Sequence, residues 1–154
     1  MIMATAAKVK PPASFWIIVV ISLIWNAIGA NDYLQTQLEN RAYLESATQG
    51  MNVTVDELIA HFRSYPLWAD MAWGLGVWGS VAGSLLMLAR SRYATHAFIA
   101  SLAGLVLSTI YTLIDPMPGS DGSMVLIAFT VVIFAVLLGL VWYARKMTAR
   151  RVLT

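Results

Sequence analysis

The chain has no cysteine and very little charge. Only 12% of its 154 residues are Asp, Glu, Lys or Arg, against about 25% in an ordinary soluble domain. The lack of cysteine excludes disulfides, thiolate metal sites and thiol redox chemistry. The lack of charge excludes a soluble globular enzyme, a disordered protein and a nucleic-acid-binding domain. The net charge of +2 is therefore not evidence of a nucleic-acid partner.

Long apolar segments dominate the sequence instead. Four of them reach the roughly 20 residues that cross a hydrocarbon core about 30 Å thick, and they span 14–34, 67–88, 94–114 and 123–143. Each is expected to be helical, because backbone polar groups cannot stay unpaired in lipid. The first segment is long for a cleaved signal peptide, so we interpret it as a retained helix. The sequence predicts one all-α membrane domain over 1–154, built as a four-helix bundle.

The charged residues are sorted between the two sides of this predicted bundle. Eight of the ten basic residues flank one side, and all eight acidic residues lie on the other. The eight basic residues are Lys8, Lys10, Arg90, Arg92, Arg145, Lys146, Arg150 and Arg151. Because basic residues mark the cytoplasmic face of a membrane, both termini are predicted to be cytoplasmic. The last four are also expected to attract anionic lipid, at roughly 1 kcal/mol each near the surface.

The segment 35–66 is the only sizeable piece outside the four spans. We expect the first helix to continue beyond the membrane to about Thr48, with Gly50 as its C-cap. A capping box that starts at Thr54 then predicts a short helix over 54–64 with one apolar face. This helix is predicted to pack over the outer mouth of the bundle, and the alternative is a lid or a docking site for a partner.

Small residues recur on the second span. Apolar side chains gain little by leaving lipid for one another, so close backbone approach and hydrogen bonds must hold a membrane bundle together. Gly76 and Ser80 lie on one stripe of this span, and Gly79 and Gly83 form a GxxxG motif on the adjacent stripe. The first three spans are therefore expected to form the tight core, with the fourth facing more lipid.

Asn26 lies near the middle of the first span. An unpaired amide in hydrocarbon is costly, so this side chain is expected to point inward. One interpretation is a hydrogen bond to a serine of another span or to a Trp indole. The other is a ligand-binding group in an aromatic wall formed by Trp25, Trp73 and Trp78. Such a wall suits a sugar, a quinone head group or an apolar drug.

Three carboxylates form a second candidate site. Asp32, Asp70 and Asp115 lie at the predicted outer ends of the first three spans. With His61 or Arg63 above them, they suggest a cation-binding vestibule or a point of proton access. The alternative is that they are hydrated carboxylates at helix ends, and Asp70 is also favoured there by the helix dipole.

No motif of catalysis, cofactor binding or metal binding is visible. The sequence contains no P-loop, CxxC, HExxH or serine–histidine–acid arrangement. His61 and His96 are expected on opposite sides of the membrane, so they do not make a two-histidine site. We therefore predict no cofactor and no metal.

One stretch of the chain resembles a known group of proteins. Trp25, Asn26, Gly29, Asp32 and Tyr33 follow the pattern Trp-Asn-x-x-Gly-x-x-Asp-Tyr. Together with the runs PLWAD at 66–70 and WGLGVWG at 73–79, this pattern resembles small four-span bacterial inner-membrane proteins that are often labelled sugar transporters in genomes. The resemblance implies a multi-pass protein of a bacterial inner membrane, and it transfers no site residue.

Three functional hypotheses follow. The first is a non-enzymatic accessory or structural subunit that binds a larger membrane complex or a second copy of itself. The second is a small-molecule transporter or channel, sugar-like or apolar in substrate, that forms by oligomerisation around Asn26. The third is a membrane enzyme that acts on a lipid or a quinone at the outer aspartates. Membrane lipid and another membrane protein, or a second copy, are the expected partners.

Overall fold

The computed structural model describes residues 9–120 and 123–154, so Lys8 lies outside the described residues. In this part of the chain the helices are α1 (Ala13–Gln37), α2 (Arg41–Ala47), α3 (Val55–Arg63), α4 (Leu67–Leu88), α5 (Ala94–Ile114) and α6 (Met124–Ala149). Among them, α1, α4, α5 and α6 are long and apolar enough to cross a membrane. The predicted all-α bundle with four membrane-spanning helices is confirmed.

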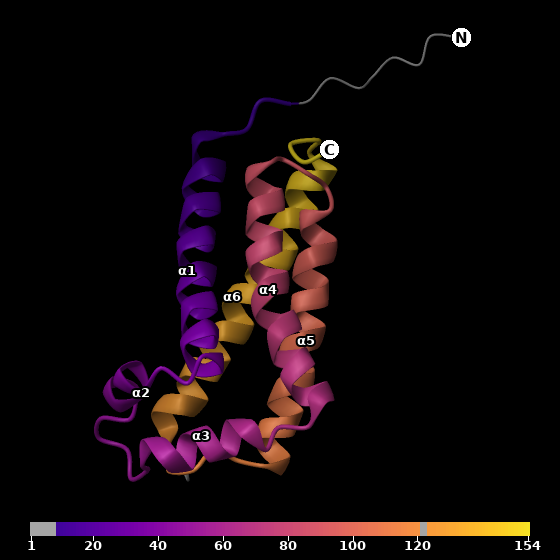
Figure 1. The fold of residues 1–154 in the computed structure, drawn as a ribbon. Coiled ribbons are helices and arrows are strands. Elements are labelled where there is room, and N and C mark those ends of the chain that lie inside the picture. The colour runs from indigo at the N-terminus through magenta and orange to yellow at the C-terminus, as the bar shows by residue number, and fades with distance from the viewer. Residues whose placement is uncertain (1–8, 121–122) are drawn as a thin grey trace.

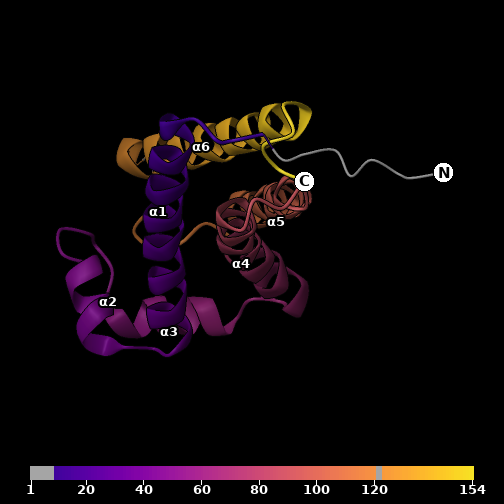
Figure 2. The ribbon, with the colours of Figure 1, turned by 90° about the horizontal axis from the view of Figure 1, so that it is seen from above.

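The two ends of the bundle differ (Figure 1). Val9 and the C-terminal residues lie at one end, called here the terminal end, where the Val9 backbone N–H donates a hydrogen bond of 3.2 Å to the carbonyl of Arg151. Helices α2 and α3 lie at the opposite end, called here the α3 end. Seen from above, α4 and α5 lie together, whereas α1 and α6 run in different directions (Figure 2).

The first helix ends earlier than the sequence predicts. It stops at Gln37 instead of continuing to about Thr48, because Glu39 takes a left-handed conformation with φ of 51° and Asn40 caps the separate helix α2. This conformation costs a non-glycine residue roughly 1–2 kcal/mol. Arg63 of α3 holds Glu39 there through two hydrogen bonds of 2.6 Å. The prediction of one continuous helix was wrong, since a distant arginine and a capping asparagine break it.

The last helix is longer than predicted. It continues past Tyr143 to Ala149, which places Arg145 and Lys146 on its final turns. The Lys146 ammonium lies 4.6 Å from the centroid of the Trp142 ring, a cation–π contact that lets the charge remain near an apolar surface. Basic residues near a helix C-terminus are also favoured by the helix dipole.

The C-terminal residues fold back and fill the terminal end. Leu153 is buried in an apolar cluster that includes Phe15 and Phe98. The Arg90 guanidinium secures this turn by donating to the backbone carbonyls of Val9, at 2.6 Å, and Val152, at 3.2 Å. Val9, the C-terminal residues and the α4–α5 connection are thereby joined at the terminal end of the bundle.

Helices α4 and α5 make the closest contact of the fold. A Cβ atom at Gly104 would lie 2.6 Å from the carbonyl oxygen of Ala72 and 2.5 Å from the nitrogen of Gly76, so the two backbones touch. Three small residues predicted to pack between helices face α5, namely Gly76, Gly79 and Gly83. Ser80 instead contacts α1, because its carbonyl accepts a hydrogen bond from Asn26.

Helices α2 and α3 form a layer at the α3 end. The predicted capping box is present, since the Thr54 hydroxyl accepts the Glu57 N–H at 3.2 Å and the Glu57 carboxylate accepts the Thr54 N–H at 2.8 Å. The apolar face of α3 packs against Leu44 of α2 and against Met117 in the α5–α6 connection. The predicted short amphipathic helix is confirmed, and it joins the two halves of the chain at this end.

The α4–α5 contact predicts a strong effect of a single methyl group. Gly104→Ala is expected to destabilise the protein by about 1–3 kcal/mol, because Ala72 and Gly76 leave no room for the new carbon. Thermal melting in detergent measures the effect. Gly139→Ala is the matched control, since no atom lies within 4 Å of a Cβ at that position. Equal melting temperatures for the two variants would contradict the close approach.

The α2–α3 layer is expected to loosen in acid. A hydrogen bond from Arg63 lowers the pKa of Glu39, and hydrogen bonds from Thr54 lower the pKa of Glu57. Carboxyls with a lowered folded pKa stabilise the fold above their unfolded pKa, and this contribution is lost as the pH falls through the folded value. Amide hydrogen exchange in α3, corrected for intrinsic rates, should therefore accelerate below about pH 4. Amides of α5 serve as the internal reference, and parallel behaviour of the two helices would contradict the prediction.

Candidate functional site

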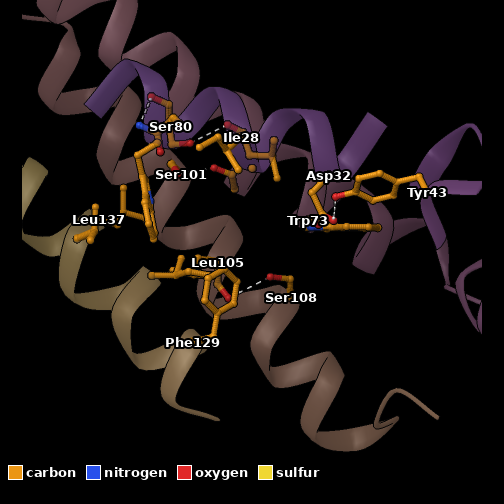
Figure 3. Close-up of a pocket in the computed structure, with 17 residues that line it drawn as sticks. Ile28, Asp32, Tyr43, Trp73, Ser80, Ser101, Leu105, Ser108, Phe129 and Leu137 are labelled. Atoms are coloured by element: carbon orange, nitrogen blue, oxygen red, sulfur yellow. Dashed lines mark hydrogen bonds between the residues drawn. The ribbon is translucent and has the colours of Figure 1, made fainter. Parts of the chain in front are cut away.

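A cavity of about 430 Å³ lies among the four long helices, in the half of the bundle toward the α3 end (Figure 3). This volume falls in the range of about 300–1,000 Å³ that is typical of small-molecule sites. Its lining comes from all four long helices and from α2. The lining residues are Trp25, Asn26, Ile28, Gly29, Asp32, Tyr43, Trp73, Gly76, Val77, Ser80, Ser101, Leu105, Ser108, Phe129, Ile133, Val136 and Leu137.

The cavity opens between α1 and α6. Four of its lining residues are exposed, and they are Ile28, Gly29 and Asp32 of α1 and Phe129 of α6. No atom lies within 4 Å of a Cβ placed on Gly29, so the wall is open at that point. Two aromatic contacts join these helices, Phe15 with Tyr143 at 6.4 Å and Trp25 with Phe129 at 6.5 Å between ring centroids, and Gly29 lies one turn beyond Trp25 along α1.

Asn26 serves both roles that the sequence suggests for it. The side chain is buried and donates hydrogen bonds to the Ser84 hydroxyl, at 2.9 Å, and to the Ser80 carbonyl, at 3.3 Å. The Ser84 hydroxyl in turn donates to Ser22 at 3.3 Å, so α1 and α4 share a small polar network. The same Asn26 side chain lines the cavity, and no described residue donates to its carbonyl oxygen, Oδ1.

Two of the three predicted tryptophans reach the cavity. Trp25 and Trp73 line it, whereas Trp78 does not. Trp78 is 45% exposed and lies edge-on to Tyr33, at 6.4 Å between ring centroids. Trp78 lies outside the cavity because five residues of helix rotate a side chain roughly 140° away from Trp73.

The three predicted carboxylates have separate partners. Asp32 lines the cavity, but Asp70 and Asp115 do not. Asp70 accepts a hydrogen bond of 2.6 Å from Gln37, and Asp115 accepts one of 2.9 Å from Tyr111. Within the described ranges, no group of three or more His, Cys, Asp or Glu residues is arranged to hold a metal ion. The three carboxylates therefore do not line one common vestibule.

The two α3 residues predicted above these carboxylates also lie elsewhere. His61 is buried, and its Nδ1 is 3.9 Å from the carboxylate of Asp115. The Arg63 guanidinium forms a salt bridge with the Glu39 carboxylate. Neither side chain lines the cavity. His61 therefore faces the end of α5, and Arg63 ties α3 to the connection between α1 and α2.

Tyr43 is a cavity residue that sequence reasoning missed. Its hydroxyl donates a hydrogen bond of 2.8 Å to Oδ1 of Asp32, and Figure 3 shows Trp73 beside this pair at one end of the cavity. The hydrogen bond to Asp32 raises the pKa of Tyr43 to about 12, because ionising the hydroxyl would break that bond. Only the break between α1 and α2 folds Tyr43 back onto Asp32, and the sequence carries no periodic signal for that contact.

The cavity serines cannot donate to a ligand without breaking an existing hydrogen bond. The hydroxyls of Ser80, Ser101 and Ser108 each donate to a backbone carbonyl of α4 or α5. Their remaining capacity is to accept. Ser101 and Ser108 recur at helical spacing on α5, which is the signal that places both on the cavity face.

The C-terminal basic residues lie at the terminal end of the bundle, whereas the cavity lies in the half toward the α3 end. Arg145, Arg150 and Arg151 are exposed, and Lys146 is half-buried against Trp142. None of the four lines the cavity. Their interaction with anionic lipid stays a prediction.

Asn26→Leu is expected to weaken the contact between α1 and α4. The substitution removes two donated hydrogen bonds of the amide, and interhelical hydrogen bonds in membranes contribute about 0.6–2 kcal/mol. The melting temperature in detergent should therefore fall. Ser22→Ala is the milder control, because Ser22 contributes only one acceptor to the network. A leucine variant as stable as the wild type would contradict the bridging role.

Comparisons with known proteins identify no relative of this chain. No family model, no curated protein and no solved structure matches this chain.

Proposed function

We propose that this chain is a small multi-pass membrane protein that binds a mostly apolar small molecule between its helices. The observation that carries the proposal is the cavity of about 430 Å³ within a single chain. An apolar molecule in this space would contact side chains from all four long helices.

An apolar ligand suits the walls better than a free sugar does. Between its rim and Asn26 the cavity is lined by aliphatic side chains, among them Val77, Leu105 and Leu137. A sugar would bring many hydroxyl groups, and each one buried without a partner is costly. The hydroxyls of the nearby serines already donate hydrogen bonds to backbone carbonyls. The cavity therefore favours a molecule with few polar groups.

The opening between α1 and α6 points to access from the lipid. Ile28 and Phe129 at its rim are 64% and 55% exposed and apolar, as expected of side chains that face acyl chains. Binding is the step that one chain can perform alone. Transport across the membrane would require an oligomer, because a single four-helix chain leaves little room for alternating access.

We place the protein in a bacterial inner membrane with both termini cytoplasmic. The described basic residues at the terminal end and the acidic residues toward the α3 end support this orientation. An accessory subunit role is compatible with ligand binding and stays a prediction. A lipid- or quinone-directed enzyme has less support, because the three aspartates have separate partners.

Photolabelling in lipid nanodiscs tests the proposed binding. A small neutral phenyldiazirine probe partitions into the bilayer and, if the cavity takes apolar molecules, also reaches inward-facing residues such as Ser101 and Leu105. Gly29→Phe places a ring at the open wall, where no atom lies within 4 Å of the new Cβ. This variant should keep its melting temperature and lose most labelling of the inward-facing residues, as mapped by mass spectrometry.

Gly139→Phe is the matched control. Gly139 has the same open surroundings but does not line the cavity, so labelling should match the wild type. Probe attached only to lipid-facing residues, with the same pattern in the wild type and Gly29→Phe, would overturn the proposal.

A further inference from the structure

The cavity offers a ligand many acceptors and few donors. Its free acceptors include Oδ1 of Asn26, Oδ2 of Asp32 and the lone pairs of three serines. The only lining side chains with an N–H not donated to a described residue are the indoles of Trp25 and Trp73. Tyr43 has an O–H group, but it is given to Asp32. The polar groups that this lining accommodates best are thus hydrogen-bond donors and positive charges.

The charge of the lining points the same way. Asp32 is the one carboxylate among the lining residues, and no Lys, Arg or His is among them. Tyr43 binds one oxygen of this carboxylate and leaves Oδ2 without a donor from the described residues. A nearby negative charge attracts a cation and repels an anion. An acidic ligand would meet no compensating base.

Aromatic rings surround the carboxylate. Trp73 and Tyr43 lie beside Asp32 at the same end of the cavity (Figure 3). Trp73 is itself held in place by stacking on Phe62, at 5.3 Å between centroids and 20° between planes. Tryptophan and tyrosine faces bind ammonium groups by cation–π attraction, and quaternary ammonium ligands are recognised by such aromatic cages.

We infer that the molecule bound in this cavity is an apolar organic cation. Its ammonium group sits between the Asp32 carboxylate and the rings of Tyr43 and Trp73. Its apolar body extends inward along Leu105 and Phe129. This inference rests on the function proposed above, and it adds the charge and the orientation of the ligand.

Depth and access fit this class of ligand. Asp32 is an exposed residue at the rim, so its charge is not deeply buried without a partner. The ligand's cationic group therefore stays near the membrane surface while its body enters between α1 and α6. At the inner end, Oδ1 of Asn26 can accept one further hydrogen bond, which favours cations that carry a second donor on the apolar body.

A matched set of competitors tests the inference. Benzyltrimethylammonium, its neutral isostere neopentylbenzene and the anion benzenesulfonate would compete with the phenyldiazirine probe in nanodiscs of phosphatidylcholine. The cation should protect Ser101 and Leu105 from labelling at lower concentration than the neutral compound, and the anion should not protect. Asp32→Asn should weaken protection by the cation about tenfold or more and leave protection by the neutral compound unchanged.

Two further variants separate charge from folding. Asp32→Glu retains the charge and should retain the preference for the cation. Asp70→Asn removes a carboxylate that is bonded to Gln37 and does not line the cavity, so competition should match the wild type. The melting temperature of each variant in the same nanodiscs establishes that it is folded.

The outcomes distinguish this inference from the function on which it rests. Equal protection by the cation and the neutral isostere, or an unchanged cation affinity in Asp32→Asn, would overturn the cation and leave an apolar binding site standing. Inward-facing residues that are never labelled in the absence of competitors would overturn the binding function itself.

Discussion

The close contact between α4 and α5 is the constraint on which the rest of the structure depends. Apolar surfaces gain little by meeting in lipid, so these helices associate through backbone atoms, with Gly104 against Ala72 and Gly76. Helix α1 then joins through α4, and α6 joins through α5. Since α1 and α6 attach to opposite members of this pair, they touch each other through two aromatic pairs, Phe15 with Tyr143 and Trp25 with Phe129. The cavity is the space that this arrangement leaves.

Asn26 connects the stability of the bundle with its proposed function. Its amide N–H groups hold α1 to α4, and the same side chain lines the cavity. Burying this polar side chain costs free energy, and the residue both bridges two helices and lines the cavity. Asp32, an exposed residue, also has two roles in this proposal. Tyr43 donates a hydrogen bond to one carboxylate oxygen, and the other oxygen is the one proposed to face the ligand.

The sequence predicted the membrane spans well and the site only in part. Hydropathy defines 67–88 and 94–114 to the residue, because lipid forces apolar segments of fixed length into helices. It placed Asn26 inward for the same reason. Contacts between distant residues were not predictable. Arg63 holds the break at Glu39 from 24 positions away, and that break brings Tyr43 onto Asp32. Helical spacing separates Trp73 from Trp78, but only the neighbouring helices decide which of them faces inward.

A density map of the protein in a lipid nanodisc, with benzyltrimethylammonium present, is the most direct test of a ligand site between the helices. We expect α1 and α6 to lie apart at the level of Gly29, with non-protein density beside Asp32, Tyr43 and Trp73. A bundle in which α6 closes onto α1 and Phe129 fills the space between them would contradict it.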